Sequence, residues 1–271
     1  MKNEPNSLAS EALTKVPAVT LWFWIIKVLA TTLGETGGDS VTMTWLGETT
    51  SHPTANGYLI GTAIFLGALI VLVIFQVRAK RFHPFLYWAT IVASTTAGTT
   101  MADFADRSLG IGYPGGSILL FACVIATLAS WKWSQGSVSV QTVRTPKVEA
   151  FYWATITFSQ TLGTALGDWA ADAGLGYGGG ALVFAAALVL VAAAYYWTRA
   201  SHVLLFWIAF ILTRPLGATV GDFFDKPSAE GGLDISRPLA SAIIAAVIVM
   251  LILVLPQRPA ERVATRAEDV H

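Results

Sequence analysis

Charged residues are scarce in this sequence. Only 13% of its 271 residues are Asp, Glu, Lys or Arg, whereas soluble domains carry about 25%. Hydrophobic residues make up 54% of the chain, and the mean hydropathy is +0.60. A water-facing domain of this size could not cover itself with so little charge, which indicates a membrane protein. The formal net charge is zero, so the composition favours neither an acidic nor a basic partner and argues against nucleic acid.

Cysteine and histidine are almost absent. Cys123 is the single cysteine, which excludes an internal disulfide framework and a cysteine-clustered metal site, and its apolar surroundings indicate a packing role. The histidines are His52, His83, His202 and His271. All lie in predicted loops or near the ends of predicted spans, which argues against zinc, copper or nickel as cargo. Because a Ser-His-Asp set and a nucleotide-binding motif are also missing, we expect no enzyme and no required cofactor.

A secretory leader is not indicated. The first 17 residues are polar and lack both an early apolar run and a small-residue cleavage site. We expect residues 1–17 to form a cytoplasmic tail, residues 18–256 a single membrane domain, and residues 257–271 a second cytoplasmic tail.

Long apolar segments are abundant. A helix that crosses the hydrocarbon core needs about 20 apolar residues. Four segments are plainly apolar: 58–77, 117–131, 181–197 and 238–255. Four others are apolar but contain Thr, Gly and charged residues: 19–39, 85–103, 150–168 and 203–222. The two kinds alternate along the chain, which predicts eight spanning helices.

The four mixed segments are copies of one another. Each contains a tryptophan, followed ten residues later by a glycine and five residues after that by an aspartate. These residues are Trp24, Trp88, Trp153 and Trp207, then Gly34, Gly98, Gly163 and Gly217, then Asp39, Asp103, Asp168 and Asp222. Four matches in register indicate internal duplication, with repeats at about 18–81, 82–146, 147–200 and 201–256.

With this pattern the chain resembles bacterial membrane proteins built from a fourfold tandem repeat of unknown function. In that family each repeat has two transmembrane segments and a recurrent tryptophan. The resemblance covers about residues 21–255. It implies a multi-pass protein of the bacterial inner (cytoplasmic) membrane, and it implies no particular activity.

Basic residues are unevenly distributed between the connections, which predicts the orientation. Those in the tails or after even-numbered spans are Lys2, Lys15, Arg78, Lys80, Arg81, Lys132, Arg144, Lys147, Arg199, Arg258, Arg262 and Arg266. The connections after odd-numbered spans contain only Arg107, Lys226 and Arg237. Both termini are therefore expected in the cytoplasm, with the aspartate-bearing ends of the odd spans outside.

Because each repeat has two helices, every repeat enters the membrane from the same side and in the same direction. We therefore expect an all-α, polytopic membrane helix bundle. Its eight transmembrane helices come from four parallel two-helix repeats, pseudo-symmetric about the membrane normal. The four odd helices would surround a common axis, and the more apolar even helices would face lipid.

A polar stripe runs along each odd helix. With 100° per residue and the tryptophan at position zero, positions +7, +10 and +14 share one face. Position +7 is Thr31, Thr95, Gln160 and Arg214. Position +14 is Gly38, Ala102, Gly167 and Gly221. We interpret the glycines at +10 as close-packing positions, which would bring the polar stripes together.

The aspartates at +15 permit two interpretations. They lie about 22 Å along the helix from the tryptophan, in the outer third of a hydrocarbon core about 30 Å thick. In one interpretation they sit at the outer interface, solvated or bonded to loop amides. In the other they form a carboxylate ring at the mouth of a central path. Such a ring selects cations and, with threonine hydroxyls, suits hard divalent ions such as Mg²⁺, Ca²⁺ or Mn²⁺.

Glu35 at position +11 lies about 16 Å from Trp24, close to mid-membrane, where an ionisable group is costly and usually functional. The equivalent residues are Thr99, Thr164 and Ala218. Two bases lie in these helices: Lys27 at +3, which could snorkel to the cytoplasmic surface, and Arg214 at +7. We expect a Glu35–Arg214 pair across the axis. It would act as a lock between the first and last repeats, or as a gate that releases the carboxylate to an ion or proton.

Two further features concern the span ends. Tryptophans and tyrosines there are expected to be interfacial anchors, namely Trp22, Trp24, Tyr87, Trp131, Trp133, Tyr195 and Trp197. The glycine-rich stretches 113–116 and 177–180 are expected to form tight turns or re-entrant loops.

These features favour an inner-membrane transporter of a small cation, such as divalent Mn²⁺. The expected path consists of Glu35, Asp39, Asp103, Asp168, Asp222, Thr31, Thr95 and Gln160, and its five carboxylates would ligate the metal. Arg214 and Lys27 would be charge partners or a gate. Two alternatives stay open: a proton-coupled transporter of a small organic solute, and a non-transporting structural or sensor protein. The expected partners are the lipid bilayer and the cation or solute, and the fourfold repeat is compatible with an oligomer without requiring one.

Overall fold

The computed structural model describes residues 14–49 and 56–260, and nearly all of these residues are helical. Most of both predicted tails, together with His52 and His271, lie outside the described residues. The α-helices are α1 (Leu21–Asp39), α2 (Asn56–Arg78), α3 (Pro84–Asp103), α4 (Tyr113–Gln135), α5 (Pro146–Ala170), α6 (Gly176–Trp197), α7 (His202–Asp225) and α8 (Arg237–Val254). Short helical turns connect them: η1 (Ser40–Trp45), η2 (Phe104–Ser108), η3 (Val140–Thr142), η4 (Ala171–Leu175) and η5 (Ser228–Glu230).

Several helices are long and apolar enough to cross a membrane. Within the described residues these are α2, α4, α7, α8 and the continuous run from Pro146 to Trp197 that joins α5 to α6. This run bends at Gly174, whose φ of 97° is not helical. Helices α1 and α3 fall outside this group, and both are rich in polar residues. The molecule is therefore a multi-pass membrane protein, and a lipid bilayer is its environment.

The odd helices begin at local sequence signals. The side chains of Thr20, Thr145 and Ser201 cap α1, α5 and α7 by accepting a backbone N–H from three residues further on. Helix α3 begins at Pro84, whose fixed φ and missing N–H suit the first turn. Each odd helix thus starts within about two turns of its repeated tryptophan.

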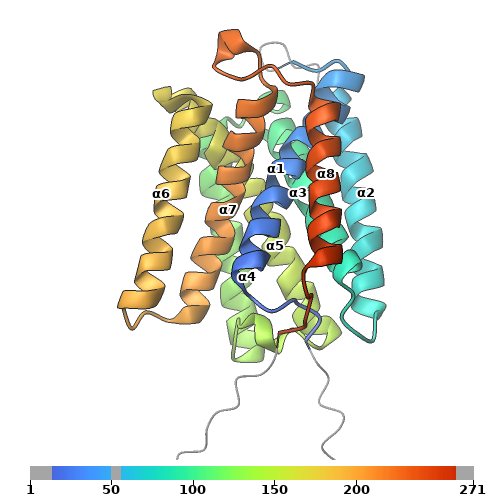
Figure 1. The fold of residues 1–271 in the computed structure, drawn as a ribbon, viewed down its shortest axis with the longest axis vertical. Coiled ribbons are helices and arrows are strands. Elements are labelled where there is room, and N and C mark those ends of the chain that lie inside the picture. Colours follow the sequence, from blue (N-terminus) through green and yellow to red (C-terminus); the bar gives the residue numbers. More distant parts are fainter. Residues whose placement is uncertain (1–13, 50–55, 261–271) are drawn as a thin grey trace, which may run out of the picture.

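The odd helices form the centre of the molecule. Helices α1, α3, α5 and α7 form a closed ring in which each packs against the next and α7 packs against α1. Every even helix covers the odd helix of the following repeat, so α2 packs on α3, α4 on α5 and α6 on α7. Helix α8 packs on α1 and completes the arrangement. Figure 1 shows α6 and α2 on opposite sides of this bundle.

Exposed apolar side chains concentrate on the even helices. Examples are Ile118 on α4, Leu182 and Leu190 on α6, and Leu253 on α8, all of which are exposed. In contrast, most threonines and all aspartates of the odd helices are buried. An exposed apolar surface of this extent suits contact with lipid.

Glycines set the spacing of the ring. A Cβ atom added to any glycine at +10 would overlap the residue at +7 of the next repeat. The pairs are Gly34 with Thr95, Gly98 with Gln160, Gly163 with Arg214, and Gly217 with Thr31. The glycines at +14 likewise face position +11, with Gly38 against Thr99, Gly167 against Ala218, and Gly221 against Glu35. The same head-to-tail contact therefore recurs around the ring and closes after four steps.

Aromatic side chains fill the ring at the end that carries the repeated tryptophans, which we term the tryptophan end. The residue before each tryptophan is also aromatic, and it contacts the tryptophan of the next repeat. The centroid distances are 5.5 Å for Phe23–Trp88, 5.8 Å for Tyr87–Trp153, 6.3 Å for Tyr152–Trp207 and 5.7 Å for Phe206–Trp24. The Tyr87 and Tyr152 hydroxyls lie 2.7 Å apart, within hydrogen-bond distance. These side chains belong to one buried core.

Two expectations about the span ends are corrected. Tyr87 and Trp131 are fully buried rather than interfacial, because Tyr87 belongs to the aromatic ring and Trp131 packs against Tyr152 and Trp207. The stretches 113–116 and 177–180 are helical and lie in the first turns of α4 and α6. The turns form at earlier glycines, among them Gly112 and Gly174, which have positive φ.

The described ends of the chain meet at the tryptophan end. The Ala18 N–H donates to the Arg258 carbonyl and the Ala260 N–H donates to the Val16 carbonyl, both at 2.8 Å. Buried Lys15 lies 2.6 Å from Glu149 and donates to the last carbonyls of α2.

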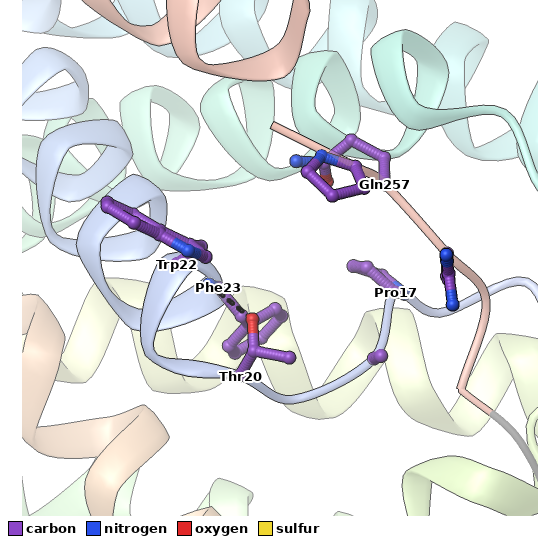
Figure 2. Close-up of a pocket in the computed structure, with 8 residues that line it drawn as sticks. Pro17, Thr20, Trp22, Phe23 and Gln257 are labelled. Atoms are coloured by element: carbon purple, nitrogen blue, oxygen red, sulfur yellow. Dashed lines mark hydrogen bonds between the residues drawn. The ribbon is translucent and has the colours of Figure 1, made fainter. Parts of the chain in front are cut away.

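A pocket of about 250 Å³ separates these terminal segments from the start of α1. Figure 2 shows Pro17 and Gln257 on one side of this pocket, with Thr20, Trp22 and Phe23 on the other.

Candidate functional site

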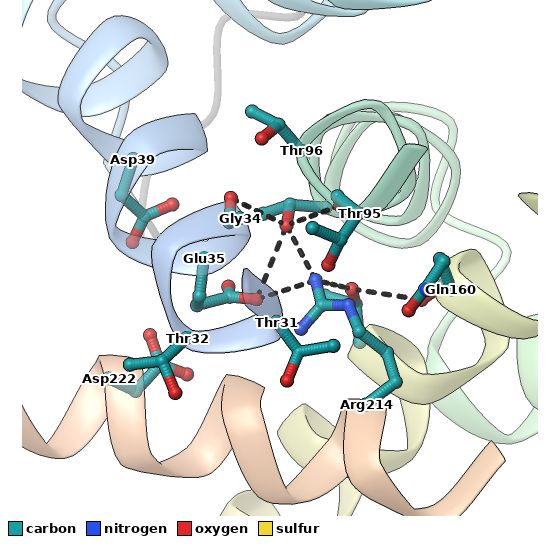
Figure 3. Close-up of polar contacts among 12 residues, drawn as sticks. Thr31, Thr32, Gly34, Glu35, Asp39, Thr95, Thr96, Gln160, Arg214 and Asp222 are labelled. Carbon is teal, nitrogen blue, oxygen red and sulfur yellow. Dashed lines mark hydrogen bonds and ion pairs between the residues drawn. The ribbon is translucent and has the colours of Figure 1, made fainter. Parts of the chain in front are cut away.

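Arg214 occupies the centre of the ring. Its Nη2 atom lies 2.9 Å from Glu35 Oε2 and donates to the hydroxyls of Thr99, at 2.6 Å, and Thr164. These three partners are the +11 residues of the other three repeats. Figure 3 shows the Glu35 and Arg214 side chains directed toward each other between the helices. The ion pair proposed from the sequence is therefore present, and hydroxyls from two further repeats complete it.

The remaining polar groups at the +7 level are less well paired. Within the described part of the chain, Arg214 Nε and Nη1, the Thr95 hydroxyl and both side-chain polar atoms of Gln160 are buried without a hydrogen-bond partner. Thr31 differs, because its hydroxyl donates to the Thr213 carbonyl at 3.0 Å. Unpaired buried polar atoms are costly, so the centre of the ring holds unused hydrogen-bonding capacity.

Lys27 does not snorkel to the surface. It is fully buried, with Nζ 4.2 Å from the centroid of the Phe210 ring and 3.4 Å from the Thr213 hydroxyl. The expectation was wrong because position +3 of α1 faces α7, so the neighbouring helix covers the side chain. Cation–π attraction and one hydroxyl take the place of a carboxylate partner there.

The four repeated aspartates are buried at the opposite end of the ring, which we term the aspartate end. Two bases bridge them in pairs. Arg107 lies 2.8 Å from Asp103 and 2.9 Å from Asp168. Lys226 lies 2.5 Å from Asp39 and 3.0 Å from Asp222. The aspartates are thus not solvated, and basic residues lie among their carboxylates.

Two tyrosines support the bridge at Arg107. Its Nη1 and Nε atoms donate to the hydroxyls of Tyr58 and Tyr113, both at 3.2 Å. Asp106, in the turn after α3, is also buried, and burial raises the pKa of its carboxyl to about 6 while Arg107 opposes that shift. The guanidinium is therefore held by carboxylates and tyrosines together.

Some of the carboxylates are close enough to hold a metal ion. Glu35, Asp168 and Asp222 each offer an oxygen within 4.8 Å of the others, and so do Asp39, Asp222 and Asp225. Asp103 belongs to neither group, although the sequence placed it among the metal ligands. Asp225 joins the second group, with Arg237 Nε 3.7 Å from its carboxylate.

The sequence interpretation missed Arg107, Lys226, Arg237 and Asp225 as site residues. A signal was present for the first two, because Arg107 follows Asp103 by four residues and Lys226 follows Asp222 by four. On a helix that spacing places opposite charges side by side. No comparable signal exists for Arg237, which reaches the site from the start of α8.

The helices change pitch at the aspartates. In the first three repeats the α-helix ends at or just after the aspartate and continues as a π-helical turn, in η1, η2 and η4. Helix α7 continues to Asp225 without such a turn. Short π-helical segments within helices are frequent at functional sites, which fits the concentration of charge there.

Comparison with known proteins identifies the repeat. A family model described as Repeat of Unknown Function (DUF347) matches residues 22–82, 86–137, 151–201 and 205–257. The four tandem repeats expected from the tryptophan, glycine and aspartate spacing are thereby confirmed. Neither a curated protein nor a solved structure matches the chain.

Proposed function

This chain belongs to the family defined by the DUF347 repeat, and we propose that it is an inner-membrane transporter that moves a small cation, such as Mn²⁺, along the ring axis. In this proposal all eight α-helices span the bilayer. The four two-helix repeats run parallel and are pseudo-symmetric about the membrane normal. The aspartate end faces outside and both termini are cytoplasmic, because basic residues concentrate near the tryptophan end.

The observation that carries the proposal is the group of three buried carboxylates, Glu35, Asp168 and Asp222. Carboxylates this close repel one another, and burial adds a desolvation cost. A cation between them removes both penalties, and carboxylate oxygens favour hard divalent ions. The three side chains come from α1, α5 and α7, so a bound ion would link three of the four central helices.

The charge balance of the cluster fits a divalent cargo. Its acids are Glu35 and the four repeated aspartates, and its bases are Arg107, Arg214 and Lys226. With ordinary ionisation, five carboxylates against three bases leave two negative charges. One divalent cation or two protons would neutralise them. We therefore propose that metal and protons compete for the same carboxylates, which would couple their movements in opposite directions.

The filled tryptophan end and the central Arg214 favour a carrier over an open channel. The aromatic core fills the tryptophan end, and Arg214 lies across the centre. A fixed guanidinium on the axis would repel cations in a permanently open pore. In a carrier, the incoming cation competes with Arg214 for Glu35, and helix movements then open the tryptophan end.

A second candidate is a proton-coupled transporter of a small organic solute. The buried polar atoms of Gln160, Thr95 and Arg214 that lack partners within the described residues favour it. Amide, hydroxyl and guanidinium groups recognise carboxylates or amides rather than metal ions. Proton-dependent uptake of such a solute, insensitive to divalent ions, would support this candidate over the first.

The test is metal flux in proteoliposomes that contain the full chain. Uptake of Mn²⁺, Mg²⁺, Ca²⁺, Zn²⁺ and Co²⁺ is measured with and without a pH gradient, for the parent and for Asp168→Asn and Asp222→Asn. Asp106→Asn is the matched control, because Asp106 is a buried carboxyl at the same end that belongs to neither group of three. Size-exclusion profiles establish that each variant is folded.

We expect selective, pH-gradient-dependent uptake that Asp168→Asn and Asp222→Asn abolish and that Asp106→Asn retains. No uptake of any ion by the folded parent would overturn the proposal. Equal losses in all three variants would place the binding site elsewhere.

A further inference from the structure

The two halves of the aspartate ring are built alike but are covered differently. Lys226 joins repeats 4 and 1, and Arg107 joins repeats 2 and 3. Each base lies four residues after its own aspartate. In the repeats that these bases reach, the residue four positions after the aspartate is Met43 in repeat 1, near Lys226, and Asp172 in repeat 3, on the Arg107 side. The covering of the two bridges can therefore be compared position by position.

The Lys226 bridge is enclosed. Met43 Sδ lies 3.6 Å from Lys226 Nζ. The segment after α7 folds back over the helix end, where the Leu233 N–H donates to the Phe223 carbonyl and the Asp234 N–H donates to the Lys226 carbonyl. Within the described residues the Lys226 side chain is only 2% exposed.

The Arg107 bridge opens into a pocket of about 360 Å³. Asp168 in its lining is buried, Arg107 is partly buried, and Asp172 and Glu230 are exposed. Tyr113 and Tyr177 also line it. The link between α5 and α6 beside this pocket is a helical turn kinked at Gly174, and Glu230, from the connection after α7, also lines the pocket.

The pocket has the chemistry of a cation site. Arg107 already shares its charge with Asp103 and Asp168, so the carboxylates of Asp172 and Glu230 leave the pocket acidic. Acidic clefts attract cations and raise their local concentration. Asp168 lines the pocket and also belongs to the buried group with Glu35 and Asp222, so the pocket borders the proposed binding site directly.

We propose that this pocket, lined by residues of repeats 2, 3 and 4, is the access route for the cation, and that Arg107 gates it. The inference rests on the proposed function. The arriving cation takes the place of Arg107 at Asp168. Arg107 then stays attached to Asp103, Tyr58 and Tyr113, which do not line the three-carboxylate group. Lys226, whose side chain is buried within the described residues, braces the other half of the ring.

Cysteine accessibility tests the route. In a Cys123→Ser background, Ala171→Cys places a thiol in the pocket, and Thr42→Cys places one at the equivalent buried position beside the Lys226 bridge. Each variant is reacted with a cationic and an anionic methanethiosulfonate reagent, with and without Mn²⁺. Mn²⁺ uptake is then measured before and after labelling.

We expect Ala171→Cys to react about tenfold faster with the cationic reagent than with the anionic one. Mn²⁺ should slow the reaction, and complete labelling should abolish uptake. Thr42→Cys should stay unlabelled in the folded protein. Equal labelling of the two positions, or full uptake after complete labelling of Ala171→Cys, would overturn the access route. Absence of uptake before labelling would instead overturn the proposed function.

Conservative exchanges test the gate. Lysine cannot form the two-pronged contact of arginine, so Arg107→Lys should loosen the hold on Asp168. We expect Arg107→Lys to lower the KM for Mn²⁺ uptake while the maximal rate is kept. Arg199→Lys, the same exchange at an exposed residue between α6 and α7, should leave both unchanged. An unchanged KM in Arg107→Lys would show that Arg107 is only structural.

Discussion

Arg214 contacts the +11 side chains of the three other repeats through a single nitrogen. Glu35 supplies the counter-charge, and the two threonines supply hydroxyl dipoles. A buried charge is tolerable only with such compensation, and removing one partner leaves the other unpaired in a low-dielectric interior. The repeats therefore differ at positions +7 and +11 in a complementary way. Repeat 1 alone carries the acid there, Glu35, and repeat 4 alone carries the base, Arg214.

Neutralising either member of this pair should destabilise the protein strongly. We expect Glu35→Gln or Arg214→Gln to lower the free energy of unfolding by about 3–5 kcal/mol each. The double variant should lose less than the sum, because it leaves no unpaired charge. Denaturant unfolding in detergent micelles, followed by tryptophan fluorescence, measures both effects. Strictly additive losses would show that the two side chains are not coupled.

The odd helices approach one another closely at glycines, which have no side chain to keep the neighbouring helix away. Gly98 lies where a Cβ atom would come within 2.9 Å of the Gln160 backbone, and backbone atoms cannot move aside as a side chain can. Gly37 of α1, in contrast, has nothing within 4 Å of such an atom. Gly98 and Gly37 are both helical, and they differ in whether a neighbouring helix occupies the place of a side chain.

Alanine substitutions should separate these two situations. Gly98→Ala is expected to destabilise the protein by about 1–3 kcal/mol, because α3 and α5 must move apart. Gly37→Ala should be neutral or stabilising by about 0.5–1 kcal/mol, because alanine is the better helix former. Thermal unfolding in detergent compares them directly. A loss at Gly37 as large as that at Gly98 would contradict close packing as the role of the repeated glycine.

The molecule closes on itself through its chain ends. Helix α8 packs on α1 in the way that each earlier even helix packs on the next odd helix, and residues 16–18 pair with 258–260 nearby. In Figure 1 these segments, at the starts of α1 and the end of α8, lie at the same end of the bundle. The interfaces are thus set by the repeats and not by which repeat comes first in the chain.

A circular permutant tests this closure. Joining residue 260 to residue 14 by a short Gly-Ser linker and opening the chain between Arg81 and Phe82 keeps every two-helix interface. We expect a folded, monodisperse protein with a melting temperature close to that of the parent. The control opens the chain at Gly67, within α2, and should not fold. Failure of the first permutant with normal expression would show that the repeats are not equivalent in assembly.

Periodic features could be predicted from the sequence because they are local. The tryptophan, glycine and aspartate spacing marks one face of a helix, and its fourfold recurrence follows from counting along the chain. The depth of Glu35 and Arg214 also follows from counting, since rise per residue converts position into height. The sequence was therefore sufficient to predict the four repeats, their polar face and the Glu35–Arg214 pair.

Which side chains meet across the ring was decided only when the helices packed. The contact of position +10 with +7 of the next repeat, the burial of Lys27 and Tyr87, and the bridges made by Arg107 and Lys226 join residues far apart in the chain. The repeats share one tryptophan, glycine and aspartate spacing, yet Lys226 is buried in one half of the aspartate ring and Arg107 lines a pocket in the other. That difference arises because exposure depends on what neighbouring segments cover, and a one-dimensional pattern holds no information about coverage.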